Sequence, residues 1–140
     1  MKLSRIEKVI LCTVAGLLVA MVTLRAEAPA RADLIARGEY LVKNVGLCSD
    51  CHTPMTDKGP NMELFLMGAA LPFQPTVEMP WSPVAPPIAG LPSMSEEQAV
   101  VFFTRGTRPD GSLPRPPMPQ FRFNDGDARA VTAYLKSLAP

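Results

Sequence analysis

The sequence predicts a single small all-α domain. Apolar residues recur at three- and four-residue steps near both ends of the chain, and no stretch alternates polar and apolar residues over the length of a useful strand. The 140 residues leave room for one domain, which excludes a multidomain enzyme or a repeat array. Only 6% of the residues are aromatic, and 14 of the 16 prolines lie from Pro54 to Pro119. We therefore expect a bound group to fill part of the core.

The first 30 residues are expected to be a signal peptide or an N-terminal membrane anchor, and residues 31–140 the folded domain. Three basic residues come first: Lys2, Arg5 and Lys8. Residues 9–24 carry no charge, and as a helix of about 24 Å they are slightly short for a bilayer span and slightly long for a signal peptide. The small residues that suit a signal peptidase are Ala28, Ala30 and Ala32. Both fates stay open, and each predicts a periplasmic domain, either soluble or tethered to the cytoplasmic membrane.

Two helices are expected at the ends of the domain. The first runs from Ala32 to Val45 with Asp33 as its cap, and it leads the chain to Cys48. The last follows Asn124 and Asp125, which can both cap a helix. Its apolar residues fall at helical spacing: Val131, Tyr134, Leu135 and Leu138.

A shorter helix is predicted between them. Ser95 and Gln98 form a capping box before an apolar run, and Gly106 is suited to end the helix. Between Met55 and Pro92 no period is sustained, and one helical turn is expected there, within Asn61 to Met67. A loop of this length inside a compact domain normally counts against such an assignment, unless the loop wraps a bound group.

The segment Cys48-Ser49-Asp50-Cys51-His52 has the form C-x-x-C-H, which is the attachment signature of c-type haem. Two thiols on one turn can add to the two vinyl groups of one porphyrin, and the adjacent imidazole can then bind the iron. This pattern predicts one covalent haem c held by Cys48 and Cys51, with His52 as an iron ligand. Burial of the porphyrin would contribute on the order of 10 kcal/mol, which offsets the shortage of large side chains.

Other uses of these three residues are less well supported. A zinc site needs about four nitrogen or sulfur ligands, and the exported part has no further cysteine or histidine. A thioredoxin-type redox pair needs a strand-to-helix junction, which this pattern does not supply. A plain disulfide between Cys48 and Cys51 would leave His52 without a role. The remaining cysteine, Cys12, lies in the uncharged segment and is interpreted as a small apolar residue.

The second axial ligand of the iron is expected to be a methionine. His52 is the only histidine, so a second imidazole cannot come from the same chain. Met118 is favoured because Pro116, Pro117 and Pro119 flank it and restrict the backbone. The other methionines of the domain are expected to fill gaps in the core: Met55, Met62, Met67, Met79 and Met94. A sulfur ligand favours Fe(II) and leaves the iron without a free site, which suits one-electron transfer.

Five stretches of the chain together carry a family resemblance. They are Gly38–Val42, Cys48–Thr53, Gly59–Asn61, Pro116–Pro119 and Ala133–Leu138. In these stretches the chain resembles the class I monohaem cytochromes c of bacteria, close to the haem domains of respiratory oxidases and dehydrogenase complexes. The resemblance implies a cytochrome c domain at residues 31–140, in which the N- and C-terminal helices cross. The proline-rich loop is expected to wrap the haem.

The resemblance also implies roles for single residues. Gly38 and Tyr134 are the candidates for the point where the two terminal helices cross. The Pro60 carbonyl is expected to accept a hydrogen bond from the imidazole of His52, which orients the ring. Trp81 and Arg105 are candidates for contacts with the haem propionates.

These observations predict a one-electron carrier of a respiratory or dehydrogenase chain. Such a protein is not itself an enzyme, although it can be a subunit of an oxidoreductase complex. An alternative from another class is a catalytic or gas-binding haem protein with an open sixth position. A third is a structural subunit that the haem merely stabilises.

The charges indicate a protein partner rather than nucleic acid. From Arg31 onward the chain has 10 basic and 11 acidic residues and no basic stripe, which argues against nucleic acid. From Arg105 to the C-terminus there are 6 basic and 3 acidic residues, so we expect the Met118 side to face an acidic patch on a redox partner protein. The alternative is a set of solvated surface arginines, with one or two of them on the haem propionates. Any membrane association is expected through residues 9–24.

Overall fold

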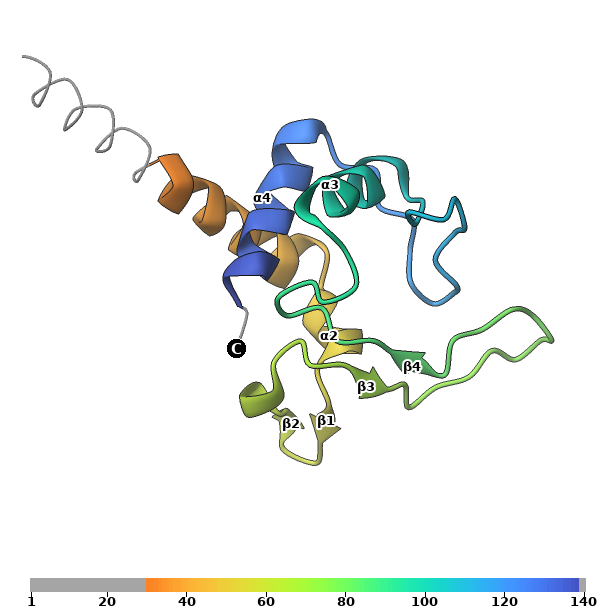
Figure 1. Ribbon diagram of the computed structural model, residues 1–140. Helices are drawn as coiled ribbons and strands as arrows, with labels where there is room; N and C mark the ends of the chain where they lie inside the picture. The colour runs from red at the N-terminus through yellow and green to blue at the C-terminus, as the bar shows by residue number, and fades with distance from the viewer. Residues whose placement is uncertain (1–29, 139–140) are drawn as a thin grey trace, which may run out of the picture. The chain divides into compact units, whose positions relative to one another are not determined.

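The computed structural model describes residues 30–138 of the chain (Figure 1). Leu34–Pro140 form one compact unit, and the expected leader segment at residues 9–24 lies outside the described residues. Among residues 30–138, no helix combines the length and the apolar character that a membrane crossing requires. The compact unit therefore supplies all of the structure discussed below.

The described residues are mainly helical, as the sequence predicts. The helices are a helical stretch at residues 30–40, a π-helix at Leu41–Val45, α2 (Cys48–His52), a 3-10 helix at Met62–Leu64, α3 (Glu96–Arg105) and α4 (Asp125–Ser137). The strands are β1 (Met55–Thr56), β2 (Gly59–Pro60), β3 (Ala69–Ala70) and β4 (Val84–Ala85). They form two antiparallel pairs, β1 with β2 and β3 with β4. Each strand has two residues, which is too short for an alternating pattern to show in the sequence.

The predicted caps of α3 and α4 are confirmed. Ser95 accepts a hydrogen bond from the Gln98 amide, and the Gln98 side chain accepts one from the Ser95 amide. Gly106 ends α3 in the left-handed conformation with φ 70°, which glycine adopts without strain. Asn124 caps α4 by accepting a hydrogen bond from the Asp127 amide.

The expected helix at Ala32–Val45 is present, but its last part is a π-helix. The backbone is α-helical over residues 30–40 and widens at Leu41–Val45. The amide of Gly46 donates to the Leu41 carbonyl at 2.7 Å, which closes the widened turn. Leu41 and Val42 are buried, so the wide turn still faces the core. Propensity alone gives no signal for such a turn.

The first helix crosses α4 at Gly38, in agreement with the predicted pair (Figure 1). A Cβ atom at Gly38 would lie 1.9 Å from the Ala130 carbonyl oxygen and 2.7 Å from the Tyr134 Cβ. The two backbones can approach this closely only because residue 38 has no side chain. The crossing thus sets the distance between the first helix and α4.

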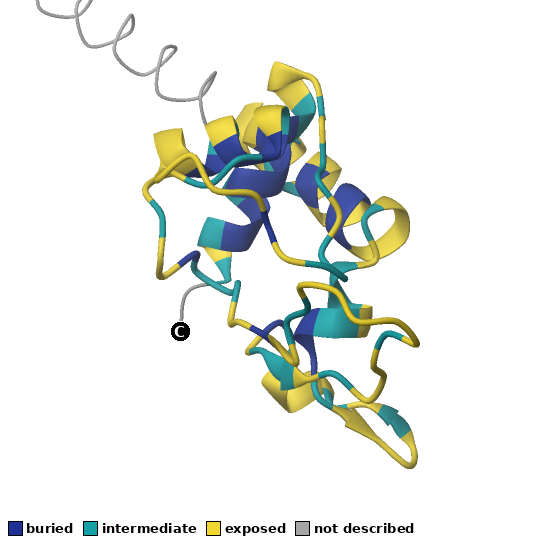
Figure 2. Ribbon diagram, turned by 90° about the vertical axis from the view of Figure 1, so that its right-hand side faces the viewer, coloured by how far each residue is buried: buried dark blue, intermediate teal, exposed yellow. Residues whose placement is uncertain are grey.

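Most of the buried residues lie on the helices (Figure 2), although Leu66, Ala85 and Leu91 of the proline-rich middle are also buried. The largest fully buried side chains are Leu66, Leu135, Val42, Val131 and Thr53. The one turn expected within Asn61 to Met67 is found as the 3-10 helix, with Asn61 as its cap. A long, mostly exposed segment therefore surrounds a small helical core.

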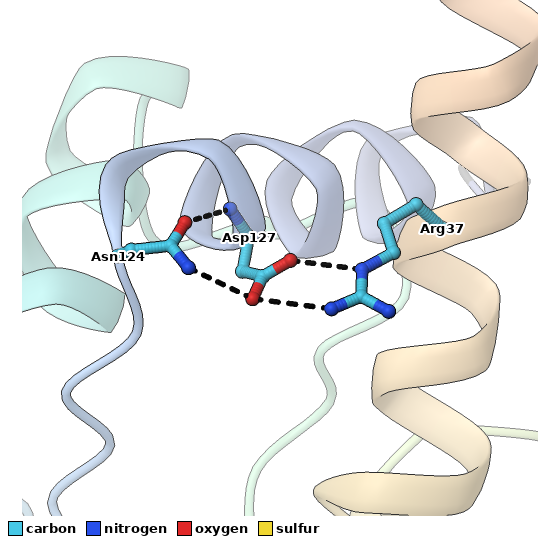
Figure 3. Close-up of polar contacts among 3 residues, drawn as sticks. All are labelled: Arg37, Asn124 and Asp127. Atoms are coloured by element: carbon cyan, nitrogen blue, oxygen red, sulfur yellow. Dashed lines mark hydrogen bonds and ion pairs between the residues drawn. The ribbon is translucent and has the colours of Figure 1, made fainter.

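An ion pair fastens the first helix to the beginning of α4 (Figure 3). Arg37 Nε donates to Asp127 Oδ1 at 2.9 Å, and Arg37 Nη2 lies 3.3 Å from Asp127 Oδ2. Asn124 Nδ2 donates to the same Oδ2 at 3.1 Å. The hydrogen bond and the positive charge of Arg37 hold the pKa of Asp127 below its ordinary value.

Substitution of Gly38 by Ala should destabilise the holoprotein by about 2 kcal/mol or more, because the new methyl group collides with the backbone of α4. Chemical denaturation followed by circular dichroism measures the change. Gly126→Ala is the matched control, since a Cβ there meets only the Asn124 Oδ1 at 3.3 Å and the change should stay within about 1 kcal/mol. Equal effects of the two substitutions would contradict the crossing described above.

The Arg37–Asp127 pair should make a small, acid-sensitive contribution to stability. Because the folded-state pKa of Asp127 is depressed, the contribution is present above the ordinary pKa and is lost as the pH falls through the depressed value. Asp127→Asn should therefore lower the thermal midpoint at neutral pH, and the difference from wild type should vanish in strong acid. If the difference in thermal midpoint between Asp127→Asn and wild type grew on acidification, the prediction would be wrong.

Candidate functional site

The C-x-x-C-H segment forms a single helical turn of its own. Leu47 adopts a left-handed conformation with φ 48°, which breaks the chain direction after the π-helix and lets α2 start at Cys48. The end of the turn is held by two hydrogen bonds: the Gly68 amide donates to the His52 carbonyl at 2.8 Å, and the Leu66 amide to Thr53 Oγ1 at 3.0 Å. The segment after the motif thus fixes the position of His52.

The imidazole of His52 is buried and oriented by a backbone carbonyl. Its exposed fraction is 5%, and its Nδ1 lies 2.7 Å from the Pro86 carbonyl oxygen. A carbonyl can only accept a hydrogen bond, so Nδ1 carries the proton and Nε2 keeps its lone pair. Burial lowers the pKa of His52, although the bond to Pro86 opposes this in part. The ring is therefore a neutral imidazole with one nitrogen free to bind a metal.

The partner of His52 differs from the expected one. Pro60 is exposed and pairs with Met55 in the β1–β2 hairpin, so its carbonyl does not serve this role. Pro86 takes its place because Gly68 brings the following strand pair close to α2. A Cβ at Gly68 would lie 2.9 Å from the Ala85 carbonyl oxygen, which shows how tightly the two segments approach. His52 and Pro86 are 34 residues apart in the sequence, so no local pattern could indicate their contact.

The two cysteines lie on the same turn as His52 and form no disulfide with each other. Burial raises the pKa of Cys48 to about 11, and burial together with the charge of Asp50 raises the pKa of Cys51. Both cysteines and His52 line one cavity. The cavity encloses about 1070 Å³ of empty space, a figure that includes its open mouth.

The other walls of the cavity are mainly apolar and come from distant parts of the chain. The apolar lining residues of α3 and α4 are Phe102, Phe103 and Leu135. Val84 and Ala85 of β4 line a further part of the wall, followed by Pro86. A flat apolar group with a polar edge would fit such a cavity better than a small polar ligand.

Two of the six candidate methionines line this cavity. Met118 lies on the wall formed by the proline-rich loop before α4, where Pro117 and Pro119 also contribute. Met94 lines the cavity as well. The other four are exposed: Met55, Met62, Met67 and Met79. The structure therefore leaves one preferred sulfur and one rival near the cysteines and His52.

The arginine expected at the site is replaced by two others. Arg105 is exposed in the last turn of α3 and does not line the cavity, whereas Arg108 and Arg115 do. The left-handed Gly106 redirects the chain after α3, so the next arginines reach the mouth instead. Sequence reasoning missed Arg108 and Arg115 because nothing local distinguishes them from other exposed arginines.

Trp81 lies beside the cavity rather than on its wall. Its ring packs edge-on against Phe73 with centroids 5.9 Å apart, and the neighbouring Ser82 lines the cavity. The indole Nε1 is buried and has no hydrogen-bond partner within residues 30–138. A buried N–H without an acceptor is costly, which points to an acceptor supplied by a bound group.

Comparison with known proteins explains this arrangement. Residues 35–139 match the family Cytochrome c. The chain belongs to the cytochrome c family. It is 37% identical over 134 residues to the cytochrome c subunit of alcohol dehydrogenase (quinone) of Gluconacetobacter polyoxogenes, and equally to that of Komagataeibacter europaeus. Each match covers 81% of this chain and 26% of the relative, so the chain spans about a quarter of their length.

Membership confirms three of the sequence-based expectations. This cytochrome has the all-α fold of the family, carries covalently bound haem c with its iron, and acts as an electron carrier rather than as a catalyst. The cavity fits that cofactor, because two thiols and a neutral imidazole stand at one wall and the remaining lining is apolar.

Proposed function

We propose that Cys48 and Cys51 would hold the haem c of this cytochrome by thioether bonds, and that His52 and Met118 would bind its iron. The observation that carries this assignment is that all four side chains line one cavity, although Met118 is 66 residues after His52 in the chain. When bound, the haem supplies a one-electron Fe(III)/Fe(II) couple. The electron enters from a donor protein and leaves to an acceptor, and no bond of a substrate is made or broken.

Each ligand is prepared by its surroundings for this role. The bond from Nδ1 to Pro86 fixes the ring of His52 and makes Nε2 the nitrogen that binds the iron. The thioether of Met118 is neutral and soft, which favours Fe(II) and raises the potential. The apolar wall around Phe102 and Leu135 keeps water from the iron and acts in the same direction.

The propionates of the haem are proposed to meet three side chains, two on the wall of the cavity and one beside it. Arg108 and Arg115 line the cavity and offer guanidinium groups for the carboxylates. Trp81 offers its unsatisfied Nε1–H, and we keep it as a contact on that ground. Arg105 is not included, because it lies on the exposed side of α3.

We further propose that the protein serves a membrane-associated dehydrogenase of the periplasm. The support is the similarity to cytochrome c subunits of quinone-dependent alcohol dehydrogenases and the uncharged segment at residues 9–24. Residues 1–30 act as a signal peptide or anchor in this proposal, and residues 31–140 as the cytochrome c domain.

The partner is proposed to present an acidic patch to the mouth of the cavity. Two carboxylates of the C-terminal part already have partners, because Asp125 pairs with Arg129 and Asp127 with Arg37. Four arginines of the same part form no ion pair with a carboxylate of residues 30–138: Arg105, Arg108, Arg115 and Arg122. Since Arg108 and Arg115 are proposed to bind the propionates, the charges of Arg105 and Arg122 remain available to steer an acidic surface.

Substitution of Met118 by Ala should keep the covalent pigment, remove the weak sulfur-to-iron band of the oxidised protein and lower the reduction potential. Optical spectra and a redox titration measure these changes. Met94→Ala is the matched control, because it removes the other thioether of the cavity and should leave band and potential close to wild type. If Met94→Ala lost the band and lowered the potential while Met118→Ala did not, Met94 would be the ligand.

The rate at which ferricyanide oxidises the reduced protein should fall as ionic strength rises, because salt screens the attraction between this anion and the arginines. The double variant Arg105→Gln/Arg122→Gln should show a slower reaction at low salt and a weaker salt dependence. Arg129→Gln, which alters an arginine already paired with Asp125, is the control. Stopped-flow rates that do not change with ionic strength would contradict the steering proposal.

A further inference from the structure

The short segment Ser82–Pro86 contacts both sides of the proposed iron site. At one end, the Ser82 amide donates to the Pro116 carbonyl at 2.8 Å, two residues before Met118. At the other end, the Pro86 carbonyl accepts from His52 Nδ1 at 2.7 Å. Ser82 and Pro86, which are four residues apart, thus connect the loop of Met118 with the imidazole of His52.

The backbone between these two contacts is held in place. Val84 and Ala85 form β4 and pair with Ala70 and Ala69 of β3. The Leu71 amide donates to the Pro83 carbonyl at 2.9 Å, and Ser82 Oγ donates to the Val84 carbonyl at 2.9 Å. A segment with these bonds and with restricted proline φ angles moves as a unit.

Within the described residues, the Ser82–Pro116 bond is the one hydrogen bond that joins the loop carrying Met118 to the rest of the chain. In the described part of the chain, residues 107–122 make no other hydrogen bond to residues outside that loop. The amide of Met118 donates within the loop, to the Arg115 carbonyl at 3.1 Å. Apart from this hydrogen bond, the loop is held by packing against the other residues that line the cavity.

We propose that the Ser82 amide is a positioning group that holds the Met118 loop in its ligating position. The inference rests on the proposed ligation by Met118 and adds the group that controls it. Without this bond the sulfur should leave the iron more often, while His52 and the covalent attachment stay unchanged.

Ser82→Pro tests the proposal because it removes the amide hydrogen. Ser82→Ala is the matched control, since it keeps the amide and removes only the hydroxyl that bonds to Val84. The readout is the binding of imidazole to the oxidised holoprotein, which competes with Met118. We expect Ser82→Pro to bind imidazole about tenfold more tightly, because the fraction of open iron increases, and to have a lower potential. Ser82→Ala should stay within about twofold of wild type.

Hydrogen exchange of the Ser82 amide in the wild-type holoprotein gives a second test that needs no variant. We expect slow exchange with Met118 bound and faster exchange once imidazole has displaced it. An oxidised wild type without the sulfur-to-iron band would overturn the ligation by Met118 and this inference with it. The band together with wild-type imidazole affinity in Ser82→Pro would overturn the positioning role alone. If that variant does not fold, an exchange rate that imidazole leaves unchanged would overturn it.

Discussion

The close contact between Gly38 and α4 is the constraint on which the rest of the domain depends. The helix that contains Gly38 leads directly through the π-helix to α2, so the distance to α4 sets where the thiols and His52 stand. The cavity wall opposite includes Leu135 of α4 itself. A larger residue at position 38 would separate the two helices and widen the site. A single absent side chain thereby controls the geometry of a cofactor cavity.

Backbone groups, more than side chains, arrange the proposed ligands. The Pro86 carbonyl orients His52, the Gly68 amide holds the carbonyl of His52, and the Ser82 amide holds the loop of Met118. Prolines suit this arrangement because they restrict φ and have no amide hydrogen, while their carbonyls can still accept a hydrogen bond. A chain with few large side chains can thus surround a large apolar cofactor. The proline-rich middle, which lacks regular structure, gains its order from these contacts.

The charges of the domain are divided between structure and recognition. Arg37 and Arg129 pair with carboxylates of α4 and support the helices. Arg105 and Arg122 are exposed and form no such pair among residues 30–138. Electron transfer needs a transient complex rather than a permanent one, and exposed charges around an apolar opening favour fast, salt-sensitive association. This division agrees with the role of an electron carrier.

The sequence by itself predicted the all-α class, the caps of α3 and α4 and a haem attachment motif at Cys48 and Cys51, while the family resemblance implied the crossing pair Gly38 and Tyr134. These features depend on local spacing or on short motifs, and a linear sequence displays both. Only the tertiary structure decided that Pro86 rather than Pro60 orients His52, that Met94 joins Met118 in the cavity, and that Arg108 and Arg115 rather than Arg105 reach its mouth. Each of these depends on how irregular, proline-rich backbone folds back over tens of residues. No periodic pattern encodes such a path, because it follows from packing around the cavity.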